Sequence, residues 1–163
     1  GPLSIYILYA RTGGLESRRE LAFHRTLRFA FMGGADVISM ASLANWPWEK
    51  VCAFKSGLSQ AQVNDLVGFY YDNFAQLPWR DLEDYWTLMF IDAERETNWG
   101  MHRPVISLRI PIDTIAKYSY DSNSSGLCVM KDNAVLALTR EAGLLDRTPV
   151  TVRLTTRDDL LSP

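Results

Sequence analysis

Two histidines are the side chains best suited to general acid–base chemistry in this chain. His24 lies among arginines in a segment with helical periodicity, and His102 lies within residues 99–103, Trp-Gly-Met-His-Arg. A hydrolytic site would place one of them beside a Ser or Cys nucleophile, and sequence alone does not reveal such proximity. The chain contains no HExxH, paired CxxC, GxSxG or phosphate-binding glycine loop. We predict that neither histidine is catalytic, and a small hydrolase with His102 or His24 as base is an alternative.

Carboxylates cluster directly after the apolar run that ends at residue 91. Asp92, Glu94 and Glu96 offer oxygen ligands, and calcium prefers about six to eight of them. Arg95 lies inside this cluster and no EF-hand spacing is present, so a polar hairpin tip is the favoured interpretation. We predict no metal and no cofactor, and leave calcium binding by residues 92–98 as an open question.

Tryptophan is the residue type that most suggests a binding surface, since Trp and Arg dominate interface hot spots. Trp79 follows a proline and Trp99 precedes a glycine, positions that are typical of loops. The alternative is that all five tryptophans complete a small core. We predict a partner-contacting surface that consists of Trp99, His102, Arg103, Asp92, Glu94, Glu96 and Trp79.

The overall charge gives no reason to expect nucleic acid as a partner. Seventeen basic and nineteen acidic residues leave a net charge of −2, which provides no general attraction for a phosphate backbone. Arginines do concentrate in the opening helical segment, where Glu16 and Glu20 partly offset them. That pattern is equally typical of the solvated side of an amphipathic helix.

The chemistry-bearing residues must be positioned by a fold that begins with helices. Residues 15–44 have helical periodicity with an interruption at Gly33 and Gly34, since adjacent glycines disfavour a helix. Ser59 and Gln62 have the form of a capping box, which predicts the start of another helix. Its expected buried stripe is Val63, Leu66, Val67, Tyr70 and Phe74.

Strand patterns dominate the rest of the chain. Residues 51–54, 88–91 and 134–138 are apolar runs typical of strands covered on both faces. Residues 105–110 and 150–155 alternate, which predicts one wet face that includes Ser107 and Arg109. Residues 131–133 are expected to form a hairpin turn and residues 121–126 a loop. The predicted class is α+β, with N-terminal helices packed on a largely antiparallel sheet of about five strands.

Length and composition suit one globular domain: 163 residues, of which 47% are apolar and 22% charged. We expect residues 1–4 to be a disordered expression scar and residues 5–163 to be a single α+β domain. The apolar run at residues 5–10 is too short to span a bilayer. It is either the stub of a deleted signal or anchor, or an edge strand.

Cys52 and Cys128 lie in two different apolar segments. In a reducing cytosol both would be inert buried thiols. In an oxidising compartment a bridge would close a loop worth about 4 kcal/mol in the chain-entropy model. The residues alone leave both states open.

Short motifs around these cysteines resemble those of a family of small bacterial envelope proteins, many of them lipoproteins. Residues 48–54, W-E-K-V-C-A-F, are similar to its W-D-K-V-C-x-F strand, and residues 86–90, W-T-L-M-F, to a second strand. Residues 126–135 resemble its late G-x-C ending, so the likeness covers about residues 36–138. The chain departs from the family at Lys55-Ser56-Gly57, which replaces a Pro-Tyr turn, and in its tail from residue 141. The resemblance implies an extracytoplasmic domain of obscure function and a Cys52–Cys128 bridge.

The expected function is therefore binding. We predict an extracytoplasmic protein-binding module without catalysis, whose partner is another protein. A concrete version is an immunity protein that neutralises a secreted antibacterial toxin. The alternatives are an accessory subunit of a bacterial envelope assembly and the hydrolase described above. The expected location is the periplasm, either free or with membrane anchoring through a missing N-terminus.

Overall fold

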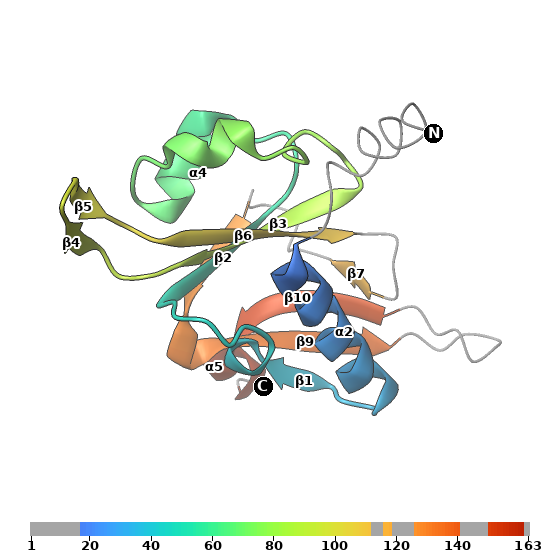
Figure 1. Ribbon diagram of the computed structural model, residues 1–163. Helices are drawn as coiled ribbons and strands as arrows, with labels where there is room; N and C mark the ends of the chain where they lie inside the picture. Colours follow the sequence, from blue (N-terminus) through green and yellow to red (C-terminus); the bar gives the residue numbers. More distant parts are fainter. Residues whose placement is uncertain (1–16, 112–115, 119–125, 141–149, 162–163) are drawn as a thin grey trace.

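The computed structural model describes residues 17–111, 116–118, 126–140 and 150–161. These residues form an α+β fold in which two four-stranded sheets pack against each other, with helices on the other face of one sheet and beside both sheets (Figure 1). A separate two-stranded ribbon projects from one end of the molecule. Both sheets contribute side chains to one core, so they fold around a shared interior.

Sheet A has the strand order β1-β9-β10-β7, and sheet B has the order β6-β3-β2-β8. All neighbours are antiparallel except β10 and β7, which are parallel. The ribbon pairs β4 with β5. The strands are β1 (Val37–Ser39), β2 (Lys50–Phe54), β3 (Tyr85–Ile91), β4 (Arg95–Thr97), β5 (Gly100–His102), β6 (Val105–Pro111), β7 (Ala116–Tyr118), β8 (Gly126–Met130), β9 (Ala134–Arg140) and β10 (Val150–Thr156).

Four α-helices occur in the described ranges: α2 (Arg18–Met32), α3 (Met40–Leu43), α4 (Gln60–Val67) and α5 (Arg157–Leu161). Two short 3-10 helices, η1 (Asp72–Gln76) and η2 (Lys131–Asn133), connect longer elements. Helix α4 lies over sheet B on the side away from sheet A, whereas α2 lies beside the two sheets (Figure 1). Among the described residues, no helix combines the length and apolar character needed to cross a membrane.

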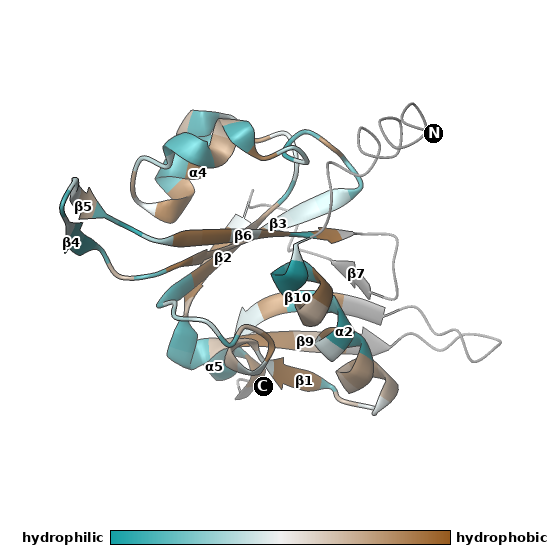
Figure 2. Ribbon diagram, in the orientation of Figure 1, coloured by the Kyte–Doolittle hydropathy of each residue, from teal (hydrophilic) through white to brown (hydrophobic). Residues whose placement is uncertain are grey.

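The main core lies between the two sheets. Alternate residues of β2, Val51 and Ala53, point into it together with Leu136 of β9 and Val152 of β10. Phe23 and Leu27 of α2 close one side, which is why the helix buries only a narrow stripe. A second cluster lies on the other face of sheet B and is formed by Cys52, Phe54, Leu58, Val63, Val67, Phe74, Met89 and Ile91. Figure 2 shows the resulting brown band along the sheet B strands, with teal on β4 and on parts of α4.

All five expected strands are present, and the prediction that residues 51–54 are covered on both faces is confirmed. The α+β class is confirmed too, but the estimate of about five strands is wrong because the described residues hold β1 to β10 in two sheets and a ribbon. Short strands such as β1, β4 and β5 have three residues each. A pattern with a period of two is not recognisable over so few positions.

Two helical expectations need correction. Residues 37–39 form β1, which pairs with β9 in antiparallel register, so the helix expected from Ala35 onward is reduced to the four residues of α3. The capping box at Ser59 and Gln62 is confirmed with both hydrogen bonds, but α4 ends at Val67, with Gly68 as its C-cap. Gly68 has φ 90, a left-handed conformation that terminates helices. The chain therefore leaves the helix before Tyr70, and Phe74 is buried from η1 instead.

Residues 131–133 do not form a hairpin turn. They form η2, which takes the chain from β8 in sheet B to β9 in sheet A. The amide of Lys131 donates to the carbonyl of Glu49 at 2.8 Å, which fixes the crossover to the residue before β2. A local turn signal predicts a change of direction but not which sheet receives the next strand.

The face of β6 that carries Arg109 is not wet. Arg109 is 1% exposed, and its guanidinium carbon lies 5.4 Å from the ring centre of Trp79 and 5.7 Å from that of Tyr85. The segment that follows α4 covers this face. An alternating pattern shows that the two faces of a strand differ, but not whether a distant segment of the chain packs on the polar face. The prediction of a solvated Arg109 is therefore wrong.

A disulfide joins Cys52 of β2 to Cys128 of β8, which sit directly opposite each other in the antiparallel register. Their Cα atoms are 4.0 Å apart and the bridge closes a separation of 76 residues. The pairing expected from the family resemblance is confirmed. The expectations for residues 1–10 and for the loop at residues 121–125 lie outside the described residues.

Candidate functional site

The most prominent surface feature is a projecting β-hairpin, residues 92–104, which we call the hairpin arm. It extends the β3–β6 pair beyond the body of the molecule, on the left of Figure 1. The amide of Asp92 donates to the carbonyl of Pro104 at 2.9 Å, so the pairing continues from the sheet into the arm. The arm is therefore a continuation of sheet B instead of a separate loop.

The tip of the arm is a tight turn that exposes one large aromatic side chain. Thr97 pairs with Gly100, and Gly100 has φ 103, a conformation that favours glycine. The Thr97 hydroxyl donates to the Gly100 carbonyl at 2.8 Å and accepts from the Trp99 amide at 3.2 Å. These bonds hold the turn while the Trp99 side chain remains 97% exposed. The turn thus presents an indole to solvent on an ordered backbone.

The register divides the arm into two faces. Glu96 lies opposite Met101, and Arg95 lies opposite His102. Since side chains alternate along strands, Glu94, Glu96, Met101 and Arg103 share one face, and Arg95 and His102 share the other. Met101 is exposed, so the first face combines an apolar centre with carboxylates.

Ion pairs within the arm neutralise part of its charge. Arg95 binds the Asp92 carboxylate at 3.1 Å, and Arg103 lies 3.8 Å from the Glu94 carboxylate. Each carboxylate of the cluster Asp92, Glu94 and Glu96, except Glu96, thus has a cationic neighbour. No group of three His, Cys, Asp or Glu side chains is arranged to hold a metal ion anywhere in the described ranges.

The base of the arm contacts the end of α4. The Arg103 guanidinium carbon lies 5.0 Å from the ring centre of Phe69, at a distance typical of a cation–π contact. Lys50 of β2 donates to the carbonyl of Val67, the last residue of α4, at 2.7 Å. Burial and, to a smaller extent, the nearby charge of Arg103 lower the pKa of Lys50. Arg103 thus attaches the base of the arm to the segment after α4, and Lys50 attaches β2 to the end of α4.

Six of the seven residues predicted for the partner-contacting surface therefore lie on one structural unit: Trp99, His102, Arg103, Asp92, Glu94 and Glu96. Trp79 does not belong to it. Trp79 is 7% exposed and its indole nitrogen donates to the Thr87 hydroxyl at 3.0 Å. A tryptophan after a proline can end a loop and still pack inward, so Trp79 is a core residue beneath sheet B.

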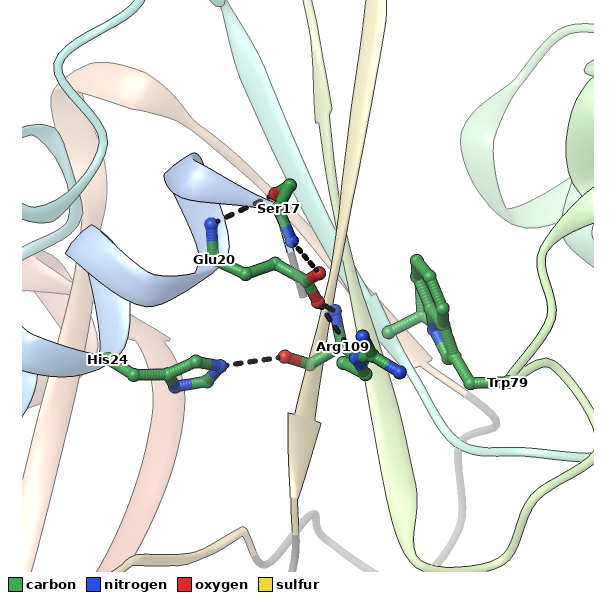
Figure 3. A network of polar contacts seen from close by, with 6 residues as sticks. Ser17, Glu20, His24, Trp79 and Arg109 are labelled. Atoms are coloured by element: carbon green, nitrogen blue, oxygen red, sulfur yellow. Dashed lines mark hydrogen bonds and ion pairs between the residues drawn. The ribbon is translucent and has the colours of Figure 1, made fainter. Parts of the chain in front are cut away.

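Trp79 instead borders a buried ionic contact between α2 and β6 (Figure 3). The Arg109 Nε atom lies 3.2 Å from a carboxylate oxygen of Glu20, and both side chains are buried. The same oxygen accepts from the Arg109 main-chain amide at 2.9 Å. His24, one turn further along α2, donates from Nε2 to the Arg109 carbonyl at 3.0 Å. His24 therefore has a structural contact with the sheet.

The two histidines are not parts of one site. His24 contacts Arg109, and His102 lies seven residues earlier on the same extended hairpin strand, at about 23 Å by strand geometry. His102 is exposed on the arm. A shallow hollow of about 280 Å³ near the β8–β9 crossover contains neither histidine. Its lining residues are Trp48, Glu49, Met130, Lys131 and Asp132.

Two aromatic residues near the base of the arm were not predicted from the sequence to lie there. Phe69 and Tyr70 follow Gly68, and Phe69 contacts the base of the arm through Arg103. Tyr70 is exposed beside it. The signal was present: Gly68 is a typical helix terminator, and ending the helix there would have removed Tyr70 from its expected buried stripe.

Comparison of the chain with protein-family models, with curated proteins and with solved structures gives no match.

Proposed function

We propose that this chain is an extracytoplasmic protein-binding module without catalysis, and that the hairpin arm is its recognition element. The observation that carries the proposal is the 97% exposure of Trp99 on a hydrogen-bonded turn. An exposed indole offers a large rigid contact area, and its burial by a partner removes much apolar surface from water. Nothing in the fold of the described residues requires Trp99 at this position.

The rest of the arm supports recognition of a protein. Met101 adds an adaptable apolar side chain near Trp99, while Glu94, Glu96 and Arg103 supply charges around it. This apolar centre with a polar rim is the usual anatomy of a protein interface. The rim charges would affect the association rate more than the affinity.

The disulfide supports the extracytoplasmic part of the proposal, because such bonds persist mainly in oxidising compartments. The concrete version is a periplasmic immunity protein, free or membrane-anchored, in which the arm blocks a secreted antibacterial toxin. An accessory subunit of an envelope assembly would use the same surface. The identity of the partner distinguishes these two versions.

The experiment is partner capture with immobilised full chain, comparing the wild type with Trp99→Ala. We expect Trp99→Ala to weaken binding by about 2 kcal/mol or more, roughly 30-fold, because hot-spot tryptophans have effects of this size. Its melting temperature should match that of the wild type, since Trp99 makes little contact with the body. Met130→Ala is the matched control, because Met130 is also exposed but lies at the end of β8.

Equal capture by the wild type and Trp99→Ala, with Met130→Ala unchanged, would assign recognition to a different surface. A large drop in melting temperature for Trp99→Ala would show that the side chain has a structural role. Mass spectrometry of proteins retained by the wild type and lost by Trp99→Ala would identify the partner.

A further inference from the structure

Helix α2 presents an apolar surface that the rest of the described chain does not cover. Leu21, Phe29 and Met32 are 49%, 67% and 70% exposed. At 100° per residue they fall within one side of the helix, opposite the buried Phe23 and Leu27. Amphipathic helices on globular proteins normally place polar residues on that outer side, so three large apolar residues there require a separate explanation.

The same outer side of α2 is strongly basic. Arg18, Arg25 and Arg28 are exposed on it, and Arg19 is exposed at its border, where its guanidinium carbon lies 5.7 Å from the Trp46 ring centre. The helix contains one acidic residue, Glu20, which is buried against Arg109. The outward surface of α2 therefore carries four positive charges and no carboxylate from the helix itself, although the whole chain has a net charge of −2.

The shape and charge of this surface favour an anionic membrane surface as its occupant. Fifteen residues make a helix about 22 Å long, and the outer side of such a cylinder is convex. Helices that lie in the plane of a membrane interface combine Phe or Leu side chains with Arg or Lys, which remain at the level of the lipid headgroups. Charge complementarity selects anionic lipid, because arginine close to such a surface is attracted by its negative potential.

We propose that the outer side of α2, consisting of Leu21, Phe29, Met32, Arg18, Arg25 and Arg28, docks the protein on the surface of an anionic lipid bilayer. This contact is independent of the hairpin arm, which projects from the other end of sheet B (Figure 1). A molecule docked through α2 would keep the arm accessible to a partner.

The test is co-sedimentation of the full chain with vesicles of phosphatidylglycerol and phosphatidylcholine, compared with vesicles of phosphatidylcholine alone. We expect binding to the anionic vesicles that weakens as the salt concentration rises, because salt screens exposed charges. Arg25→Glu with Arg28→Glu should reduce partitioning by at least about 30-fold, as expected for the loss of two cationic contacts. Lys55→Glu with Arg153→Glu is the matched control, since it makes the same charge change at two exposed positions away from α2.

A second pair of variants tests the apolar component without changing charge. Phe29→Ser with Met32→Ser should also lower partitioning, whereas Tyr70→Ser, at an equally exposed position near α4, should not. Melting temperatures of all variants should stay close to that of the wild type, because every substituted side chain is exposed.

Absence of binding to anionic vesicles at low salt would overturn the proposal, and so would equal binding to both vesicle types. Equal losses in the α2 variants and the Lys55/Arg153 control would show a nonspecific charge effect and would also overturn it. If the wild type ignores vesicles but its retention on immobilised polyglutamate depends on Arg25 and Arg28, the surface takes an acidic protein instead. The arm plays no part in these measurements, so their outcome is separate from that of the partner capture.

Discussion

Helices α2 and α4 begin in the same way but are attached to the sheets differently. Each has a capping box in which a serine and the side chain three residues later satisfy each other's main-chain amides. In α4 the reciprocal residue is Gln62, which is exposed and makes the capping bond at 2.8 Å. In α2 it is Glu20, which makes the capping bond at 3.0 Å and also pairs with Arg109. One carboxylate thus both starts a helix and fixes it to a strand.

The two helices also pack on different parts of the protein interior. Helix α2 packs into the core between the sheets and has the buried Glu20–Arg109 pair at its beginning. Helix α4 packs through Val63 and Val67 onto the second cluster, directly over the Cys52–Cys128 bridge. An ion pair depends on both charges being present, whereas a covalent bridge depends on the redox state. The two attachments should therefore fail under different conditions.

Their surroundings have opposite charge. The exposed arginines of α2 contrast with the segment that contains and follows α4, where exposed carboxylates outnumber basic groups. Those carboxylates are Asp65, Asp72, Asp81, Glu83 and Asp84. A net charge near zero for the whole chain thus conceals two regions of opposite sign.

The largest effect is expected from Glu20→Gln. Removing the carboxylate beside a buried guanidinium typically costs about 3–5 kcal/mol, while the amide oxygen preserves the shape and part of the capping bond. Urea unfolding should show this loss. Gln62→Ala in α4 is the matched control and should cost about 1 kcal/mol at most. Equal, small costs at both positions would show that the ion pair contributes little and that the two helices are attached alike.

The next effect concerns the bridge beneath α4. Cys52→Ala with Cys128→Ala should lower the free energy of unfolding by about 2–5 kcal/mol, mainly because the unfolded chain gains freedom. Titration of the denatured, unreduced wild type with a thiol reagent should find no free thiol. Reductant should lower the melting temperature of the wild type and leave that of the double variant unchanged. Two reactive thiols in unreduced wild type would contradict the bridge.

A smaller effect is expected from the N-cap serine, which both helices have. Ser17→Ala and Ser59→Ala each remove the hydroxyl that accepts from the main-chain amide of the third helical residue at 3.1 Å. Each should cost about 1 kcal/mol, a usual value for an N-cap serine. Hydrogen exchange in the first turn of each helix would measure the local effect. A much larger cost at Ser17 would mean that capping and the Glu20–Arg109 pair are coupled.

The smallest effect is a pH dependence near α4. Burial, and to a smaller extent the charge of Asp72, raise the pKa of Tyr71, although the nearby Ser107 side chain opposes them. The neutral phenol is therefore favoured in the folded state, and the stability it contributes is complete below its ordinary pKa of 10.0. That contribution is lost as the pH rises through the raised value. Tyr71→Phe should lose less stability than the wild type at alkaline pH, as measured by urea unfolding. If the free energy of unfolding of the wild type and of Tyr71→Phe fell equally with rising alkaline pH, the prediction would be wrong.

Local signals in the sequence predicted most of the elements. The pattern of Ser59 and Gln62 involves neighbours along the chain, and it located the start of α4. The apolar run at residues 51–54 indicated cover on both faces, because such a strand has no side for water. Gly100 after Trp99 indicated a loop position, and the structure places Trp99 on an exposed turn.

Long-range contacts were not predictable in this way. Arg109 alternates with apolar residues and so resembles a solvated position, but Trp79 and Glu20 cover it from distant parts of the chain. Trp79 was assigned to the surface for the complementary reason, since a proline before it marks a loop but not which way the side chain packs. The sequence indicated a polar hairpin tip after residue 91 but not the strands β4 and β5, because each is too short to give a strand signal.

The contacts of Glu20 and His24 with Arg109 also have a consequence for the edge of sheet B. β6 is an edge strand of sheet B, and an edge with unsatisfied amides and carbonyls invites a strand from another molecule. The Arg109 amide donates to Glu20 and its carbonyl accepts from His24, so at this residue the edge is already occupied by side chains of α2. A second copy cannot add a strand to the sheet at Arg109 without first displacing α2. Helix α2 therefore blocks edge-to-edge pairing of β6 at this residue.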